Sequence, residues 1–311
     1  MSYDCNIDIA AYANAIGTTY ETLPEVSKKV LANIKTGYRL LSIEERDAHI
    51  MAILKRLEEP QISRSTEENL AIFERGWSEN LALCRTQGVS LDSLRPKYVK
   101  PNSIMRFAGK FIVPENPFLF DDLCTATLNS LFTRYFTDAA AVYEFGCGTG
   151  RYLYMLGNLL PRRKLVGLDW TKASGEILKV IAEQTGLPIE GARFDMLSPG
   201  DSVKVDPGSA IYTVGAMEQI GTRFQAFLTY LLESRPAIVV HHEPILELYG
   251  EPTLYDYLAA FYHRKRNYLN GYLPALQGLE RERKIEILEV RRGGYGDPFN
   301  EGSSIIVWRP L

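Results

Sequence analysis

The chain has 311 residues, of which 46% are hydrophobic and 23% charged, as is usual for a globular protein with a large buried core. The formal net charge of −3 argues against a polyanionic partner, so we expect no nucleic acid ligand. The chain is longer than one minimal α/β domain requires, and most of the excess precedes residue 118.

The cysteines and the N-terminus indicate the compartment. No two cysteines form a C-x-x-C pair, so neither a zinc site nor a disulfide framework is expected. The first residues carry Asp4 and Asp8 instead of a basic segment, and no apolar run approaches the roughly 18 residues of a membrane span. We therefore expect a cytoplasmic protein without a membrane anchor.

From the start to about residue 95 the pattern is helical throughout. Capping-box spacings begin at Thr22, Ser42 and Ser65, and each precedes an amphipathic stripe. Gly37, Pro60 and Gly88 are the expected ends of these three helices. Such helices serve either as a cap over an active site or as a dimerisation element. We favour the cap, and a homodimer is the alternative.

Residues 101–120 contain three prolines and four phenylalanines, which predicts an ordered crossing segment and not a flexible linker. Arg106 and Lys110 lie within it. Each could bind a carboxylate of a ligand, but a surface cation is the favoured interpretation of both.

Residues 142–151 read V-Y-E-F-G-C-G-T-G-R, an apolar strand that runs into a glycine-rich bend. Gly146, Gly148 and Gly150 occupy alternate positions. Because glycine adopts positive φ freely and has no side chain, the backbone there can lie directly against a ligand. Residues 152–160 have helical spacing, so the bend directs the free N–H groups of a helix N-terminus at that ligand.

The spacing within this bend distinguishes between ligands. A dinucleotide-binding loop follows G-x-G-x-x-G, whereas this chain has E-x-G-x-G-x-G from Glu144, with Arg151 where the third glycine of the NAD motif falls. This is the S-adenosylmethionine form of the loop. An NAD-dependent oxidoreductase is accordingly disfavoured.

Two further strand ends carry carboxylates. Residues 164–170 form a short apolar strand that ends in Asp169, about 20 residues past the bend, where nucleotide-binding units place the acid that accepts the ribose hydroxyls. Thr171 can cap the next helix, predicted over 174–185, so Asp169 is expected to be free for the ribose. A third strand end offers Asp195 for an adenine amino group and Met196 to lie on the base.

With these motifs in place, residues 118–311 resemble a class I S-adenosylmethionine-dependent methyltransferase. The resemblance implies an α/β fold with a seven-stranded sheet that ends in an antiparallel β-hairpin, and alternating residues 284–290, a glycine-rich loop and residues 304–308 supply the hairpin. Residues 1–117 then form an N-terminal helical cap and crossing segment. The cofactor-binding residues expected on this basis are Glu144, Gly146, Cys147, Gly148, Asp169, Trp170, Asp195, Met196 and Val214.

Catalytic side chains are expected after the fourth and fifth strands, because ligands of open α/β sheets bind at the carboxyl ends of strands. Glu218 follows the fourth strand, and His241 and His242 end the fifth. Neighbouring strand residues point to opposite faces, so at most one histidine is expected to face the reacting methyl group. Three consecutive residues at one strand end rarely converge on a metal, and no metal site is expected.

A tyrosine-rich stretch follows, in which Tyr257, Phe261 and Tyr268 share one predicted helical face. Packing on the sheet is the usual role of such a face, and cation–π binding of a sulfonium or ammonium is the alternative. The favoured function is S-adenosylmethionine-dependent methyl transfer to a small-molecule acceptor such as an amino acid, a sugar or a natural-product intermediate. Alternatives are cyclisation of the cofactor to azetidine-2-carboxylate with release of methylthioadenosine, and a non-catalytic cofactor-binding subunit.

Overall fold

The computed structural model describes residues 3–63, 66–101, 104–200, 202–250 and 252–311. Its main sheet has seven strands in the order β10-β12-β9-β8-β5-β6-β7. The strands are β5 (Ala141–Phe145), β6 (Lys164–Asp169), β7 (Ile189–Arg193), β8 (Ala210–Val214), β9 (Ile238–Glu243), β10 (Ile285–Arg291) and β12 (Ser304–Pro310).

Six of these strands run in one direction, and β12 runs antiparallel to its neighbours β9 and β10. The chain order reverses between β5 and its neighbours β6 and β8, which makes the carboxyl ends of these strands the place where an open α/β sheet binds ligands. This is a class I methyltransferase fold with a C-terminal antiparallel hairpin, as the sequence predicted.

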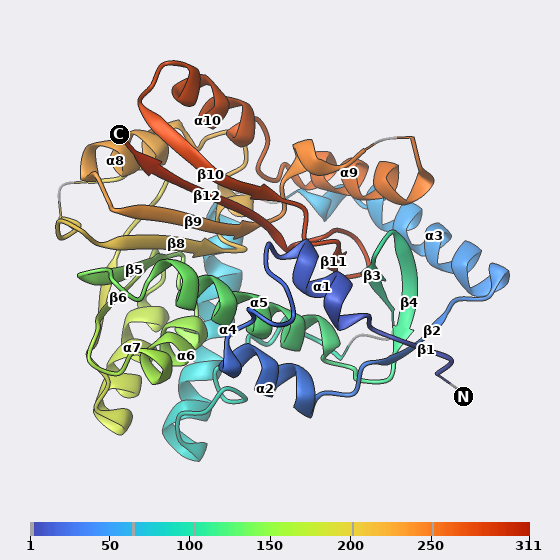
Figure 1. Cartoon of the computed structure of the whole chain (residues 1–311), viewed down its shortest axis with the longest axis horizontal. Helices are drawn as coiled ribbons and strands as arrows, with labels where there is room; N and C mark the ends of the chain where they lie inside the picture. The colour runs from blue at the N-terminus through green and yellow to red at the C-terminus, as the bar shows by residue number, and fades with distance from the viewer. Residues whose placement is uncertain (1–2, 64–65, 102–103, 201, 251) are drawn as a thin grey trace.

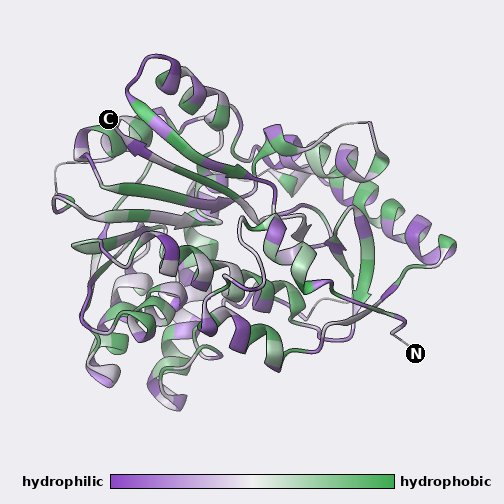
Figure 2. Ribbon diagram, viewed as in Figure 1, coloured by the Kyte–Doolittle hydropathy of each residue, from purple (hydrophilic) through white to green (hydrophobic). Residues whose placement is uncertain are grey.

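Helices cover both faces of the main sheet (Figure 1). Successive strand residues contribute to different cores because side chains alternate across a strand: Val142 packs with α5, α6 and α7, whereas Tyr143 packs with α8 and α10. The central strands are correspondingly hydrophobic along their length (Figure 2). The helices are α5 (Leu119–Tyr135), α6 (Arg151–Leu159), α7 (Lys172–Thr185), α8 (Gln225–Ser234) and α10 (Tyr272–Arg281).

The N-terminal region differs from the helical prediction, because two of its segments are strands of a second sheet. This sheet has the order β1-β2-β4-β3-β11 and lies beside the main sheet (Figure 1). Its strands are β1 (Cys5–Asn6), β2 (Gly37–Leu40), β3 (Met105–Phe107), β4 (Lys110–Pro114) and β11 (Tyr295–Gly296). Strands of two to five residues carry little periodic signal, and their partners come from distant parts of the chain.

The N-terminal helices are α1 (Ile9–Ala15), α2 (Glu25–Asn33), α3 (Ile43–Glu58) and α4 (Thr66–Gln87). The capping box at Ser42 is confirmed, since its hydroxyl accepts from the Glu45 N–H and the Glu45 carboxylate accepts from the Ser42 N–H. The box at Thr22 is wrong: Pro24 precedes α2 without a side-chain cap. Gly37 begins β2 instead of ending a helix, and the box at Ser65 includes a residue outside the described ones.

Arg106 is not the surface cation that the sequence favoured. Its side chain is fully buried, with the guanidinium carbon 3.5 Å from the ring centroid of Tyr255. It donates a hydrogen bond to the carbonyl oxygen of Tyr255 and lies 4.0 Å from the Glu301 carboxylate. Arg106 thereby joins β3 to α9 (Leu254–Arg266), whereas Lys110 is exposed.

Among the helices of the described segments, none has both the length and the hydrophobicity required to cross a membrane.

Candidate functional site

The glycine-rich bend between β5 and α6 has the backbone that its sequence predicts. Gly146, Gly148 and Gly150 all have positive φ, from 51° to 74°, and Gly150 is the N-cap residue of α6. A Cβ atom on Gly146 would lie 2.3 Å from the Cβ of Ala216, the second residue after β8. Glycine is therefore required here both by backbone conformation and by the closeness of the neighbouring strand end.

Asp169, at the end of β6, is tied to this bend. One carboxylate oxygen accepts a hydrogen bond from the Gly148 N–H at 2.9 Å, and the other accepts from the N–H and the hydroxyl of Thr171. Thr171 also caps α7, as expected, but Asp169 is not free of local hydrogen bonds as the sequence suggested. A carboxylate oxygen accepts more than one hydrogen bond, so Asp169 retains capacity for ribose hydroxyls.

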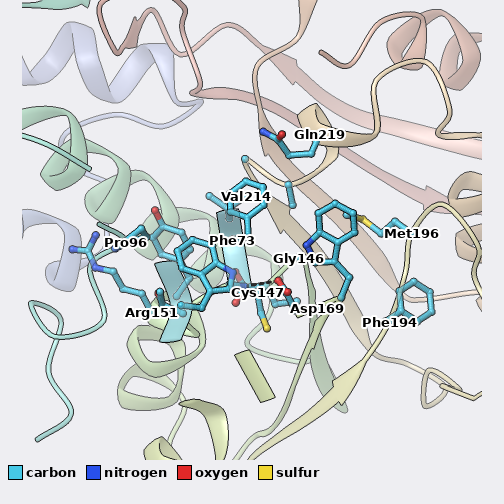
Figure 3. Close-up of a pocket in the computed structure, with 18 of the residues that line it drawn as sticks. Phe73, Pro96, Gly146, Cys147, Arg151, Asp169, Phe194, Met196, Val214 and Gln219 are labelled. Carbon is cyan, nitrogen blue, oxygen red and sulfur yellow. Dashed lines mark hydrogen bonds between the residues drawn. The ribbon is translucent and has the colours of Figure 1, made fainter. Parts of the chain in front are cut away.

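The bend opens into a cavity that we call the glycine-loop pocket, and Gly146, Gly148 and Asp169 line it. Figure 3 shows Gly146 and Asp169 among the residues around this pocket. All nine residues expected to bind the cofactor line it. Glu144 is buried beneath the bend and accepts a hydrogen bond from the Tyr212 hydroxyl, and burial raises the pKa of its carboxyl group well above the usual value. Asp195 and Met196 come from the end of β7, on the far side of Asp169.

One wall of the pocket comes from α4, one of the N-terminal helices for which a cap was favoured, although no residue of this helix was predicted to line the site. Phe73 and Trp77 stack with ring centroids 5.5 Å apart, and Trp170 lies 6.5 Å from Phe73. A Cβ atom on Gly148 would lie 3.1 Å from the Trp77 ring, so the indole packs directly on the bend. Phe73 and Trp77 are one helical turn apart, a signal that also fits ordinary core packing.

A second cavity, with a volume of about 520 Å³, continues from the glycine-loop pocket, and we call it the adjoining cavity. The two cavities share lining residues from α4, α6 and the end of β8, among them Trp77, Tyr152 and Val214. Glu218 and His242 line only the adjoining cavity of the two. Asp297 and Asn300 also line it and were not predicted as site residues. Tyr268, for which ligand binding was the alternative to packing, lines it too, but it follows the end of α9 and does not share its helical face.

The two histidines of β9 lie on opposite faces of the main sheet. His242 lines the adjoining cavity, is 1% exposed, and has no hydrogen-bond partner for either ring nitrogen among the described residues. His241 lies in the core on the other face and contacts Thr213, Tyr272 and Trp308. Because the Trp308 N–H donates to Nε2 of His241, that nitrogen is the acceptor and Nδ1 donates to the Thr213 hydroxyl.

His241 is accordingly expected to stabilise the fold without touching a ligand. The His241→Asn variant should unfold with a free energy about 3 kcal/mol lower at pH 7.5, because the buried hydroxyls and the indole N–H lose a shared partner. Urea denaturation measures this difference. The variant should retain its ligand affinity, and a strong loss of affinity without a loss of stability would contradict this assignment.

The same variant gives a pH test. Burial lowers the pKa of His241 to about 3, so its stabilisation is complete above the unfolded pKa of about 6.5 and is lost as the pH falls toward 3. At pH 5 protonation of this histidine in the unfolded wild type has lowered the free energy of unfolding by about 2 kcal/mol. The variant has no imidazole at this position and is spared that loss. Repeated urea denaturation should therefore show the gap between the two proteins shrinking to about 1 kcal/mol. An unchanged gap would be inconsistent with a buried neutral imidazole.

Glu243, the last residue of β9, lies beside the loop after β8 that carries Glu218. The Glu243 carboxylate accepts hydrogen bonds from the backbone N–H groups of Ala216 and Met217, and it holds the turn that begins η2 (Met217–Ile220). Burial raises the pKa of Glu218 to about 8, with a further contribution from the negative charge of Glu243. A carboxyl group with a pKa near neutrality can exchange a proton with a bound ligand.

No protein-family model matches this chain, and a search of curated proteins found no match. Solved structures give distant similarities. Magnesium protoporphyrin IX methyltransferase from Synechocystis PCC 6803 is 14% identical, with 60% of this chain and 83% of that chain covered and a TM-score of 0.45. The N,N-8-amino-8-demethyl-D-riboflavin dimethyltransferase from Streptomyces davawensis is 16% identical, with 76% and 69% covered and a TM-score of 0.42.

A variant of the branched-chain polyamine synthase from Thermus thermophilus is also 16% identical, with 61% of this chain covered and a TM-score of 0.43. The match spans only 56% of the length of that synthase. These similarities are too distant to assign an activity or a substrate to this chain.

Proposed function

We propose that this protein binds S-adenosyl-L-methionine in the glycine-loop pocket and transfers its methyl group to a small-molecule acceptor in the adjoining cavity. The fit of the pocket to this cofactor rests on the glycine bend, where a single Cβ on Gly146 would fill the space beside Ala216. In this assignment the amides around Gly146 and Gly148 hold the amino-acid end, Asp169 holds the ribose, and Asp195 and Met196 hold the adenine.

The observation that carries methyl transfer is the adjoining cavity, which gives a separate acceptor room next to the glycine-loop pocket. When bound, the cofactor supplies an electrophilic methyl group on a sulfonium. The chain's own part is to align the acceptor with that methyl group and to exclude water, which Trp77 and Tyr152 favour at the junction of the two cavities. Glu218 and His242 are the two predicted catalytic residues on the acceptor side, and we assign proton transfer to Glu218.

The proposal is tested by ligand binding and by product analysis. Isothermal titration is expected to show binding of S-adenosylhomocysteine and none of NAD. Incubation with S-adenosylmethionine and a fractionated small-molecule extract should yield adenosylhomocysteine together with a methylated compound. Binding of NAD alone would contradict the proposal, and methylthioadenosine formed without any acceptor would show cofactor cyclisation instead.

A further inference from the structure

Of the carboxylates that line the adjoining cavity, Glu218 and Asp297 come from separate segments. Glu218 follows β8, and Asp297 lies in the loop between β11 and β12. Neither has an ion-pair partner in the described part of the chain: the Gln219 amide donates to Glu218 at 2.6 Å, and Asp297 accepts from the backbone N–H groups of Phe299 and Asn300. Burial raises the pKa of both, so a cation between them would stabilise their ionised forms.

Arg266 also lines this cavity, and its positive charge partly offsets the raised pKa of both carboxylates, although its hydrogen bond is made elsewhere. Its Nη1 donates to the carbonyl oxygen of Ile62 at 2.7 Å, and its guanidinium carbon lies 5.0 Å from the ring centroid of Tyr268. Within the described segments it forms no ion pair with either carboxylate. Of the other charged residues that line the cavity, Asp121 is buried and already ion-paired with Arg151, whereas Arg75, Glu79 and Lys97 are exposed and screened by solvent.

His242 is an independent indication of a polar ligand. A buried imidazole normally finds a hydrogen-bond partner, yet both ring nitrogens of this 1% exposed side chain lack one among the described residues. Burial lowers its pKa to about 4, so the ring is neutral near pH 7 and one nitrogen accepts a hydrogen bond. A ligand that donates an N–H or O–H satisfies that accepting nitrogen, and the ionised carboxylates of the same cavity favour such a donor over an acceptor.

Aromatic rings narrow the choice between these donors. Phe120 and Tyr268 line the same cavity as the carboxylates and His242. Ring faces attract an ammonium ion and give no comparable attraction to a neutral hydroxyl or to a carboxylate. Two unpaired carboxylates, a neutral acceptor imidazole and aromatic walls together match a cationic N–H donor.

Resting on the methyl transfer proposed above, we propose that the acceptor is an amine that enters the adjoining cavity as its ammonium ion, paired with Glu218 and Asp297 and hydrogen-bonded to His242. The ammonium gives one proton to the Glu218 carboxylate. The freed lone pair on nitrogen then forms the N–C bond while the electron pair of the breaking C–S bond moves to sulfur. The products are a methylated ammonium ion and an uncharged thioether, and Glu218 later returns its proton to solvent.

Three probes of similar shape and different charge test this inference. Benzylamine, benzyl alcohol and benzoate are titrated at pH 7.5 into the full chain saturated with S-adenosylhomocysteine. Benzylamine should bind most tightly and benzoate should not bind. Glu218→Gln and Asp297→Asn should each weaken benzylamine about tenfold, since each removes one charge partner. Glu58→Gln, at an exposed glutamate of α3, is the matched control and should leave the affinity unchanged.

The affinity for S-adenosylhomocysteine separates the outcomes. If the wild-type protein fails to bind S-adenosylhomocysteine, both the proposed methyl transfer and the amine acceptor are wrong. If it binds but benzoate binds better than benzylamine, or no probe binds, or neither variant changes the benzylamine affinity, the amine acceptor alone is wrong. Retained adenosylhomocysteine affinity in each variant verifies folding, and either variant suffices if the other does not fold.

Discussion

Replacing Asp169 with alanine is expected to weaken the binding of S-adenosylhomocysteine about 100-fold. The carboxylate has two roles, because it holds the Gly148 N–H at 2.9 Å and, in our proposal, accepts the ribose hydroxyls. Hydrogen bonds to a charged group contribute about 1.5 to 3 kcal/mol each, and about 3 kcal/mol corresponds to a factor near 100 in affinity. Isothermal titration measures the change directly.

Two further substitutions make this result specific. Asp138→Ala removes an exposed aspartate that precedes β5 and should leave affinity within a factor of two, roughly the ±0.5 kcal/mol expected of surface changes. Asp169→Asn keeps the shape but not the charge, and should fall between wild type and Asp169→Ala. Undiminished affinity in Asp169→Ala would overturn the assignment of this carboxylate to the ribose.

Gly146→Ala is expected to abolish cofactor binding and to lower the free energy of unfolding by about 3 kcal/mol. The backbone at Gly146 has φ of 74°, which costs an L-residue about 1 to 2 kcal/mol. The added methyl would also lie 2.3 Å from the Cβ of Ala216, and overpacking of this kind costs about 1 to 3 kcal/mol. Titration with S-adenosylhomocysteine and urea denaturation report the two effects separately.

A second substitution separates the two causes. Ala216→Gly removes the atom with which the new methyl collides, so the double variant should regain the stability lost to overpacking. Its free energy of unfolding should stay about 1 to 2 kcal/mol below that of the wild type, because the positive φ still strains the alanine. Binding should return in part. If Gly146→Ala alone binds the cofactor as wild type does, close approach of the backbone at this position is not required.

The sequence was sufficient to predict the strand ends of the main sheet, because the relevant signals are local. Glycines at alternate positions indicate a bend with positive φ, and a carboxylate at the end of the next strand marks the sheet edge where ligands bind. All nine residues expected at the cofactor therefore line one pocket. Alternation along β9 also implied that only one of His241 and His242 faces the site, although which face each takes depends on the packed sheet.

The remaining site residues could not be found this way, because they come from segments without a distinctive local pattern. Phe73 and Trp77 form a stripe that predicts an amphipathic helix but not the surface it packs against. Asp297 lies in a loop, and nothing in its neighbours indicates a cavity. Arg106 was misjudged for the same reason: its buried environment is built by Tyr255 and Glu301, both distant in sequence.

The smaller sheet links the beginning of the chain to the acceptor side of the site. Its edge strand β11 leads directly into the loop that carries Asp297 and Asn300, and β11 pairs only with β3 in the described sheet. Residues 1–117 are thus more than a cover, since β3 anchors the segment from which one cavity wall is made. A shortened chain that starts at residue 118 would lose the Trp77 ring that packs on the glycine bend together with the strand that anchors the acceptor wall.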